Sequence, residues 1–282
     1  MTENGKTIQA GVVGWPVSHS LSPRLHGFWL AELGIDGTYG ALAVAPDDLE
    51  AILRSLPGRG FAGVNLTVPH KEAAAAIVDT MDSVARRIGA VNTIVVGADG
   101  SLAGSNTDGY GFIENLKSGA PQWTADNSTA VVLGAGGAAR AIIAALFDAG
   151  VKELRLVNRT GSRAESLKDD IGGAITVVPW ADRSAALEGA GLLVNTTTLG
   201  MTGEEPLEIH LSPLPAEAIV TDIVYAPLTT PLLKDAAGRG NPTVDGLGML
   251  LHQARPGFHQ WFGTAPAVTD ALREHVLEGL ER

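Results

Sequence analysis

The sequence predicts an α/β fold with two domains, each built around a mainly parallel sheet, and three observations support this. Short apolar, β-branched runs alternate with Ala- and Leu-rich stretches of helical length, as in repeated βαβ units. A glycine-rich fingerprint starts near the middle of the 282 residues. The two last predicted helices, 247–262 and 266–280, are followed by no strand, so they suit packing onto a neighbouring domain.

Composition restricts the class of protein. Hydrophobic residues make up 45% and charged residues 18%, which is typical of a folded chain. The 31 acidic and 20 basic residues give a net charge of -11, the wrong sign for a nucleic-acid partner. That charge is compatible with a monomer or a homodimer. Cysteine is absent, which excludes disulfides, thiolate metal sites and thiol catalysis and suits a reducing cytoplasm.

Neither a membrane nor a metal is expected as a partner. Residues 1–10 are polar, and the longest apolar stretch, 130–147, is interrupted by Arg140. The seven histidines follow no ligand spacing, so we expect no metal site.

Ten strands are predicted, each a short apolar or β-branched run bounded by turn residues. They cover residues 8–13, 38–44, 63–67, 92–96, 130–133, 153–157, 175–178, 192–195, 219–223 and 242–244. Helices are expected in most of the intervals between them. One begins after Ser20-Leu21-Ser22-Pro23, where a serine in the role of a helix cap is the plain interpretation.

The strand at 130–133 leads directly into Gly134-Ala135-Gly136-Gly137-Ala138-Ala139 and then a helix, which is the order of a Rossmann dinucleotide fingerprint. Gly134 allows the tight turn, Gly136 lets a pyrophosphate approach the backbone, and Ala139 allows close helix packing. The alternative is a glycine-rich turn in an Ala-rich α/β protein.

The residue after the next strand distinguishes the two nicotinamide dinucleotides. An NAD enzyme usually has a carboxylate there, whereas this chain has Asn158, followed by Arg159, Thr160 and Arg163. Two guanidinium groups and nearby hydroxyls favour a 2′-phosphate, so NADP is expected over NAD. An ordinary helix start capped by Thr160 or Ser162 is the alternative.

Two charged residues are candidates for proton transfer. Lys71 follows a strand and Pro69 at an expected helix start, where a cation opposes the helix macrodipole, so its presence suggests a chemical role. A surface lysine reaching solvent is the alternative. Asp108 suits the first turn of the helix after Asn106-Thr107, and by itself it is better explained by the helix dipole than by catalysis.

Taken together, the motifs resemble the shikimate dehydrogenase family of NADP-dependent enzymes, and the resemblance covers nearly the whole chain. The matching strings include Ser20 to Pro23, Asn65 to Lys71, Gly89 to Thr93, Asn106 to Gly109, the Gly134 fingerprint, Asn158 to Thr160, Asn195 to Met201, Asp222 to Pro227, Asp245 to Leu250 and Gln253. This resemblance implies reversible reduction of 3-dehydroshikimate to shikimate in chorismate and aromatic amino acid biosynthesis.

The resemblance also implies the roles of particular residues. The catalytic pair would be Lys71 and Asp108. The substrate carboxylate would bind Ser20, Ser22 and Tyr225, and the ring hydroxyls Thr67, Asn92, Asp108 and Gln253. The pyrophosphate would lie on Gly134, Ala135, Gly136, Gly137 and Ala138, the 2′-phosphate on Asn158, Arg159, Thr160 and Arg163, and the nicotinamide beside Ile223 and Gly246.

The same resemblance implies a substrate-binding domain of residues 1–105 plus 240–282 and a Rossmann NADP-binding domain of residues 106–239. Three alternatives stay open. A quinate-oxidising paralogue usually uses NAD, and Ser22 and Asn158 speak against it. The others are a ligand sensor on the same fold and a reductase of another cyclic hydroxy acid.

Overall fold

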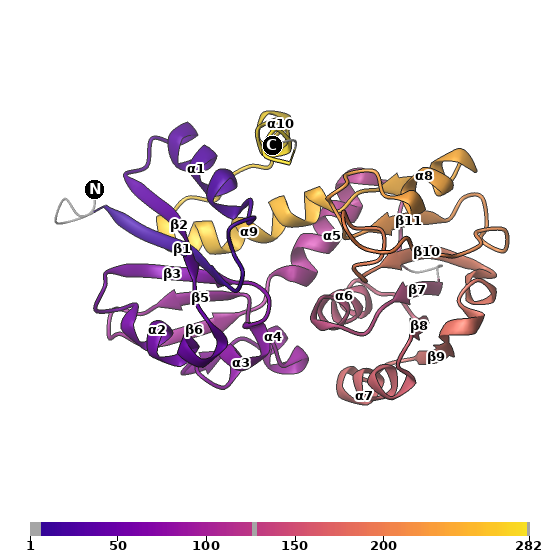
Figure 1. Ribbon diagram of the computed structural model, residues 1–282, viewed down its shortest axis with the longest axis horizontal. Helices are drawn as coiled ribbons and strands as arrows, with labels where there is room; N and C mark the ends of the chain where they lie inside the picture. Colours follow the sequence, from indigo (N-terminus) through magenta and orange to yellow (C-terminus); the bar gives the residue numbers. More distant parts are fainter. Residues whose placement is uncertain (1–6, 126–128, 281–282) are drawn as a thin grey trace. The chain divides into compact units, whose positions relative to one another are not determined.

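The computed structural model describes residues 7–125 and 129–280, which form two compact units (Figure 1). Unit 1 comprises residues 1–107 and 253–282, and unit 2 comprises residues 108–252. The predicted division placed residues 240–252 in the first domain and 106–107 in the second. The structure groups 240–252 with unit 2, because β12 (Thr243–Val244) pairs with β11 (Ile219–Asp222) and Asn115 donates to the Asp245 carbonyl at 2.7 Å.

Unit 1 contains a six-stranded mixed sheet in the order β2-β1-β3-β5-β6-β4. The strands are β1 (Ile8–Gly14), β2 (Gly37–Ala43), β3 (Phe61–Leu66), β4 (Thr80–Met81), β5 (Thr93–Val96) and β6 (Leu102–Ser105). β1 is parallel to β2 and β3, whereas β5 is antiparallel to both β3 and β6. The turn between β5 and β6 is too short for a crossover helix, so these two strands form a hairpin. Neither the two-residue β4 nor the four-residue β6 is among the ten predicted strands.

The helices of unit 1 are short. They are α1 (Ser22–Glu32), α2 (Leu49–Ser55), α3 (Lys71–Ala75), α4 (Ser83–Ile88) and α10 (Asp270–Leu277), with a 3-10 turn η1 (Pro46–Asp48). The prediction of a helix over 266–280 was too long at both ends. Thr269 starts α10 later, because its hydroxyl accepts the Leu272 N–H and caps the first turn. The predicted helix 247–262 is confirmed as α9 (Leu247–Phe262), whose residues lie in both units.

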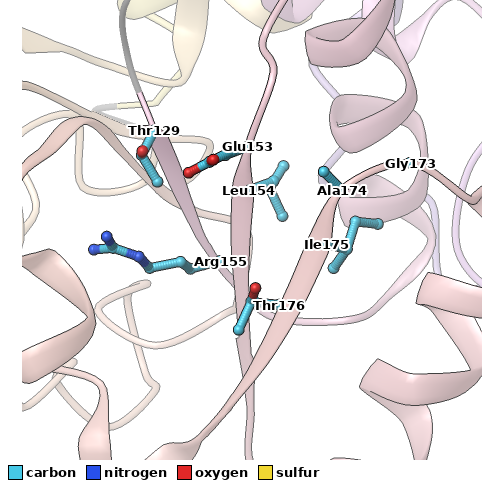
Figure 2. Close-up of a pocket in the computed structure, with 8 residues that line it drawn as sticks. All are labelled: Thr129, Glu153, Leu154, Arg155, Gly173, Ala174, Ile175 and Thr176. Atoms are coloured by element: carbon cyan, nitrogen blue, oxygen red, sulfur yellow. The ribbon is translucent and has the colours of Figure 1, made fainter.

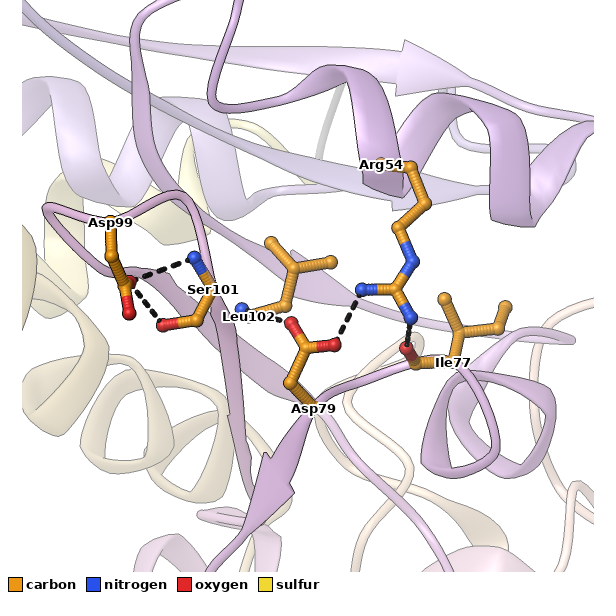
Figure 3. Close-up of polar contacts among 6 residues, drawn as sticks. All are labelled: Arg54, Ile77, Asp79, Asp99, Ser101 and Leu102. Atoms are coloured by element: carbon orange, nitrogen blue, oxygen red, sulfur yellow. Dashed lines mark hydrogen bonds and ion pairs between the residues drawn. The ribbon is translucent and has the colours of Figure 1, made fainter.

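A cluster around Asp79 ties three segments of unit 1 together (Figure 3). Its carboxylate accepts the Leu102 N–H at the start of β6 and an Arg54 N–H from α2, both at 2.7 Å. The Leu102 amide, followed by Arg54, lowers the pKa of Asp79 below its usual value. Leu102 is the first residue of β6 and Ser105 is the last. The cluster around Asp79 therefore stabilises the end of β6 that is opposite to the end near the predicted site residues.

Unit 2 contains a fully parallel sheet in the order β12-β11-β10-β7-β8-β9. Its other strands are β7 (Thr129–Leu133), β8 (Leu154–Asn158), β9 (Ile175–Pro179) and β10 (Ala190–Asn195). Its helices are α5 (Asp108–Gly119), α6 (Gly137–Asp148), α7 (Gly161–Ile171) and α8 (Pro231–Gly238), with 3-10 turns η2 (Trp180–Asp182) and η3 (Ala185–Leu187). The predicted α/β fold with mainly parallel sheets is confirmed.

The order of the unit 2 strands determines where a ligand can bind. Along the chain, β7 to β9 extend the sheet in one direction and β10 to β12 in the other, so the order reverses between β7 and β10. Ligands of such sheets bind beyond the carboxyl ends of the strands at this reversal. Successive β7 residues, such as Val131 and Val132, enter hydrophobic clusters on opposite faces, so the sheet is buried on both sides. Within the described ranges, no helix is long and apolar enough to cross a membrane.

Candidate active site

Strand directions bring several predicted substrate residues to one edge of the unit 1 sheet. Thr67 directly follows the carboxyl end of β3, and its N–H donates to the Val13 carbonyl of β1 at 3.0 Å. Because β5 is antiparallel to β3, the amino end of β5 lies at the same edge, with Thr93 opposite Asn65. Asn92 precedes that end and is 3% exposed. Thr67 and Asn92 therefore belong to one polar edge.

The loop after β1 and the start of α3 reach the same edge. The Trp15 N–H donates to the Val68 carbonyl at 3.1 Å, which holds the loop with Ser20 and Ser22 beside the segment after β3. The Val91 N–H donates to the Lys71 carbonyl at 2.8 Å, so Lys71 lies beside Asn92. Unit 1 thus brings together the predicted serines, Thr67, Lys71 and Asn92.

The interpretation of a serine as the cap of α1 is supported by one bond of Ser20. Leu21 occupies the cap position and forms no side-chain cap bond, but Ser20 Oγ accepts the N–H of Ser22, the first residue of the helix, at 3.3 Å. The dipole argument for Lys71 is weaker than expected, because α3 has only five residues.

Three further predicted residues are placed separately. Gln253, in the part of α9 that belongs to unit 1, accepts the Thr107 hydroxyl on its backbone oxygen at 2.8 Å. Asp108 is the first residue of α5 and of unit 2, and it is 1% exposed. Tyr225 follows β11 in unit 2, and burial raises the pKa of its hydroxyl above the usual value.

Sequence reasoning missed the residues behind the polar edge of unit 1. The Tyr39 hydroxyl donates to Asn65 Oδ1 at 2.7 Å, and Asn65 Nδ2 donates to Thr93 Oγ1 at 3.0 Å. The Thr93 hydroxyl in turn donates to Asn92 Oδ1 at 2.9 Å. Asn65 and Thr93 lie inside motifs that the sequence analysis quoted, but Tyr39 belongs to none.

In unit 2 the predicted pyrophosphate residues form a turn and an open helix start. Gly134 has φ +106°, and a Cβ there would be 2.6 Å from Thr196 Oγ1, so only glycine fits. Around Gly136 and Gly137 no described atom beyond the adjoining residues is within 4 Å of the position of a Cβ. Gly136 is the cap residue of α6, and no side chain within the described chain caps this helix. The turn therefore offers backbone amides, a helix dipole and space to a phosphate.

The residues predicted for the 2′-phosphate follow β8 at the same edge of the sheet. Asn158 Nδ2 donates to the Thr160 carbonyl at 2.9 Å and shapes the turn into α7. Thr160 is the cap residue of α7, yet its hydroxyl bonds to none of the first-turn amides of the described helix. Arg159 and Arg163 are exposed, and neither forms an ion pair with a described carboxylate. This turn can therefore accept an anion.

The structure brings together the two residues predicted beside the nicotinamide. A Cβ on Gly246 would be 2.3 Å from the Ile223 carbonyl oxygen, so their backbones are in close contact. Asp222, which is fully buried, accepts the Val224 N–H at 3.0 Å and the Thr230 hydroxyl at 2.8 Å. Burial raises the pKa of Asp222 despite these bonds. Asp222 therefore holds the loop that carries Ile223 and Tyr225, a role that sequence reasoning missed.

One pocket of unit 2 is not part of this site. A hollow of about 300 Å³ lies beside Thr129, Leu154 and Ile175, the first residues of β7, β8 and β9 (Figure 2). Gly134 and Asn158 are at the opposite, carboxyl ends of these strands. Among the described residues, no group of three His, Asp or Glu side chains could hold a metal ion.

Comparisons with known proteins agree with this arrangement. A model described as the shikimate dehydrogenase substrate binding domain matches residues 12–94, and a model described as shikimate / quinate 5-dehydrogenase matches residues 118–202. A shikimate dehydrogenase (NADP(+)) of Paramagnetospirillum magneticum is 62% identical over 97% of this chain and 99% of its own length.

Two solved structures are similar over nearly their full lengths. Shikimate 5-dehydrogenase from Thermus thermophilus, solved with NADP(H) and shikimate, has a TM-score of 0.86 and 38% identity, and the match covers 96% of this chain and 99% of that one. Quinate dehydrogenase from Corynebacterium glutamicum, solved with NAD, has a TM-score of 0.90 and 32% identity, with coverage of 96% and 99%.

A fully parallel sheet with an open glycine turn, together with a second sheet that carries a lysine among hydroxyls and amides, defines a dinucleotide-dependent oxidoreductase. Within this class, the chain belongs to the shikimate dehydrogenase family.

Proposed function

We propose that this chain catalyses the reversible NADP-dependent reduction of 3-dehydroshikimate to shikimate. The observation that carries this proposal is the 62% identity, over 97% of the chain, to a relative named for that activity and cofactor. Two features of the chain support it independently: the polar edge of unit 1 suits a polyhydroxy acid, and the turn after β8 has arginines in place of a carboxylate.

Most residues assigned to the substrate belong to unit 1, and two of them, Asp108 and Tyr225, belong to unit 2. Ser20 and Ser22, together with Tyr225, supply hydroxyl donors for the substrate carboxylate, which an anion requires. The ring hydroxyls are assigned to Thr67, Asn92, Gln253 and Asp108. Amide and carboxylate side chains suit adjacent hydroxyls because each hydroxyl can both donate and accept.

Lys71 and Asp108 are assigned to proton transfer. When bound, NADPH supplies the hydride that reduces the ketone carbon. The carbonyl oxygen then gains negative charge, and the Lys71 ammonium group stabilises this charge and donates the proton that completes the alcohol. In the reverse direction the Lys71 amine accepts the hydroxyl proton. Asp108 is assigned to orient the substrate, and its carboxyl group is the alternative proton donor.

Unit 2 is assigned to the cofactor. The amides of Gly134, Ala135, Gly136, Gly137 and Ala138 would hold the pyrophosphate, and the open space at Gly136 fits this group. Asn158, Arg159, Thr160 and Arg163 would hold the 2′-phosphate, and exposed guanidinium groups suit its charge. The backbone at Ile223 and Gly246 would face the nicotinamide.

The proposal is tested by steady-state assays of the purified protein with shikimate and quinate, each with NADP and NAD. We expect kcat/KM to be highest for shikimate with NADP. A preference for quinate or NAD would move the chain to the quinate-oxidising branch. Absence of activity in all four pairs, from folded protein, would favour a ligand sensor or an enzyme for another cyclic acid.

A further inference from the structure

A chain of hydrogen bonds within unit 1 leads to Asn92, which the proposed function assigns to a ring hydroxyl of the substrate. It runs from Tyr39 through Asn65 and Thr93 to Asn92. From Asn92 it continues through the Thr107 hydroxyl to the backbone oxygen of Gln253. Asn65 is in the middle of this chain, on β3.

The direction of each bond follows from groups that can act in one way only. Asn65 approaches the Asn92 carbonyl oxygen at 3.2 Å, and a carbonyl only accepts, so the Asn65 atom there must be Nδ2. Its other side-chain atom is then Oδ1, which can only accept, so the Tyr39 hydroxyl donates to it.

The direction of the hydrogen bonds at Asn92 follows from the same kind of argument. The Thr107 N–H only donates and lies 2.9 Å from Asn92, so that atom must be Oδ1. Asn65 Nδ2 donates to the Thr93 oxygen, which directs the Thr93 proton to the same Asn92 Oδ1. Asn92 Oδ1 thus accepts the Thr107 N–H and the Thr93 hydroxyl, and the amide turns its Nδ2 group to the Thr107 oxygen at 3.0 Å.

We propose that Asn65 is a positioning residue: it directs the Thr93 proton to Asn92 Oδ1 and so acts with the Thr107 N–H to hold the Asn92 amide in the orientation in which Nδ2 donates to the substrate. The inference rests on the proposed function, because it assumes that Asn92 binds a ring hydroxyl. Thr93 is fully buried and Asn92 is 3% exposed, so solvent cannot replace a lost bond between them. A change at Asn65 is therefore transmitted to substrate binding through Thr93 and Asn92.

The test is Asn65→Asp, which keeps the shape of the side chain but replaces the donor Nδ2 by an acceptor oxygen. The Thr93 proton then turns to the introduced carboxylate and leaves Asn92 Oδ1. We expect the KM for shikimate to rise about tenfold or more, with kcat and the Kd for NADP changed much less, because the lost bond acts in both ground and transition states.

Asn241→Asp is the matched control. Asn241 is buried, whereas Asn65 is partly buried, and the Asn241 Nδ2 donates to the Pro215, Ala216 and Ala218 carbonyls in unit 2, away from every residue assigned to the substrate or the cofactor. This variant should lower the Tm and leave the KM for shikimate unchanged. If Asn65→Asp likewise lowers the Tm with an unchanged KM, Asn65 is merely structural and the inference is overturned.

A second pair of variants covers the case in which Asn65→Asp does not fold. Thr93→Ser keeps the hydroxyl and should keep the wild-type KM, whereas Thr93→Val removes it and should raise the KM. Equal KM values would overturn the inference.

The NMR chemical shifts of the Asn92 side-chain amide test the chain of hydrogen bonds independently of turnover. They should change in Thr93→Val and remain as in the wild type in Thr93→Ser. An inactive wild type refutes the proposed function, whereas equal NMR shifts in both variants refute the chain.

Discussion

In both units, polar groups lie at the edge of the sheet where parallel strands have their carboxyl ends. The two sites nevertheless consist of different chemical groups. In unit 1 the site consists of side chains that bond to one another, and the buried Thr93 and the partly buried Asn65 hold Asn92 in place. In unit 2 the site consists mainly of backbone at Gly134 and Gly136, with exposed arginines beside it.

This difference follows from the proposed ligands. A small polyhydroxy acid has donors and acceptors at fixed angles, so its site needs side chains of fixed direction. A pyrophosphate is an anion with acceptor oxygens on all sides, and amides at a helix N-terminus suffice for it. We therefore expect substitutions at the polar edge of unit 1 to change turnover and substrate KM, and substitutions at the glycine turn and the arginines of unit 2 to change cofactor binding.

The largest effect is expected for Lys71→Ala, which tests whether chemistry resides in unit 1. Loss of the proton donor should lower kcat roughly 10²- to 10⁴-fold. The Kd for NADPH, measured by fluorescence titration, should equal that of the wild type, because the fingerprint is untouched. Turnover within a few-fold of the wild type would refute the assignment of Lys71.

Arg159→Ala combined with Arg163→Ala tests the charge recognition of unit 2. Both side chains are exposed, so the loss of their bonds to a phosphate should weaken NADPH binding by about tenfold to a hundredfold. Binding of NADH, which lacks the 2′-phosphate, should change little. Arg183→Ala is the control, since its guanidinium donates to the Trp180 and Glu208 carbonyls. Equal weakening of both dinucleotides would contradict the assignment.

Two glycine variants separate folding from binding at the fingerprint. Gly134→Ala places a Cβ 2.6 Å from Thr196 Oγ1 at φ +106°, so it should cost about 1–3 kcal/mol of unfolding free energy. Gly136→Ala meets no described atom within 4 Å beyond the adjoining residues and should keep the wild-type Tm, yet weaken NADP binding by filling the proposed phosphate space. Urea unfolding and cofactor titration measure the two effects. Normal NADP binding by Gly136→Ala would contradict the pyrophosphate assignment.

The smallest effect concerns stability behind the unit 1 site. His26 stacks on Tyr39 with ring centroids 3.8 Å apart, and neither ring nitrogen has a hydrogen-bond partner among the described residues. Burial lowers the pKa of His26 from 6.5 to about 3, so the unfolded chain binds the proton more readily.

Stability should therefore be lost as pH falls below 6.5, by about 2 kcal/mol between pH 7.5 and pH 5 from this group. The variant His26→Phe keeps a ring against Tyr39 and should lose that part of the pH dependence. Urea unfolding at the two pH values provides the measurement. An unchanged pH dependence in the variant would show that another group is responsible.

The sequence by itself determined the α/β class, most strands, and the fingerprint from Gly134 to Ala138. These features depend on contiguous residues: a strand, a tight turn and a helix start follow each other within a dozen positions, and each has its own residue requirements. The predicted residues Thr67, Lys71 and Asn92 were also found together at one edge, because each follows or precedes a strand whose direction places it there.

Only the tertiary structure decided which residues support the site. Tyr39, Asn65 and Thr93 come from three different strands, and no local pattern links them. The bond between Asn65 and Thr93 depends on the register of β5 against β3. The bond between Tyr39 and Asn65 depends on the place of β2, which carries Tyr39, in the same sheet. The assignment of residues 240–252 to unit 2 likewise depends on the pairing of β12 with β11. Register and pairing depend on which distant segments meet, and residue order alone does not determine that.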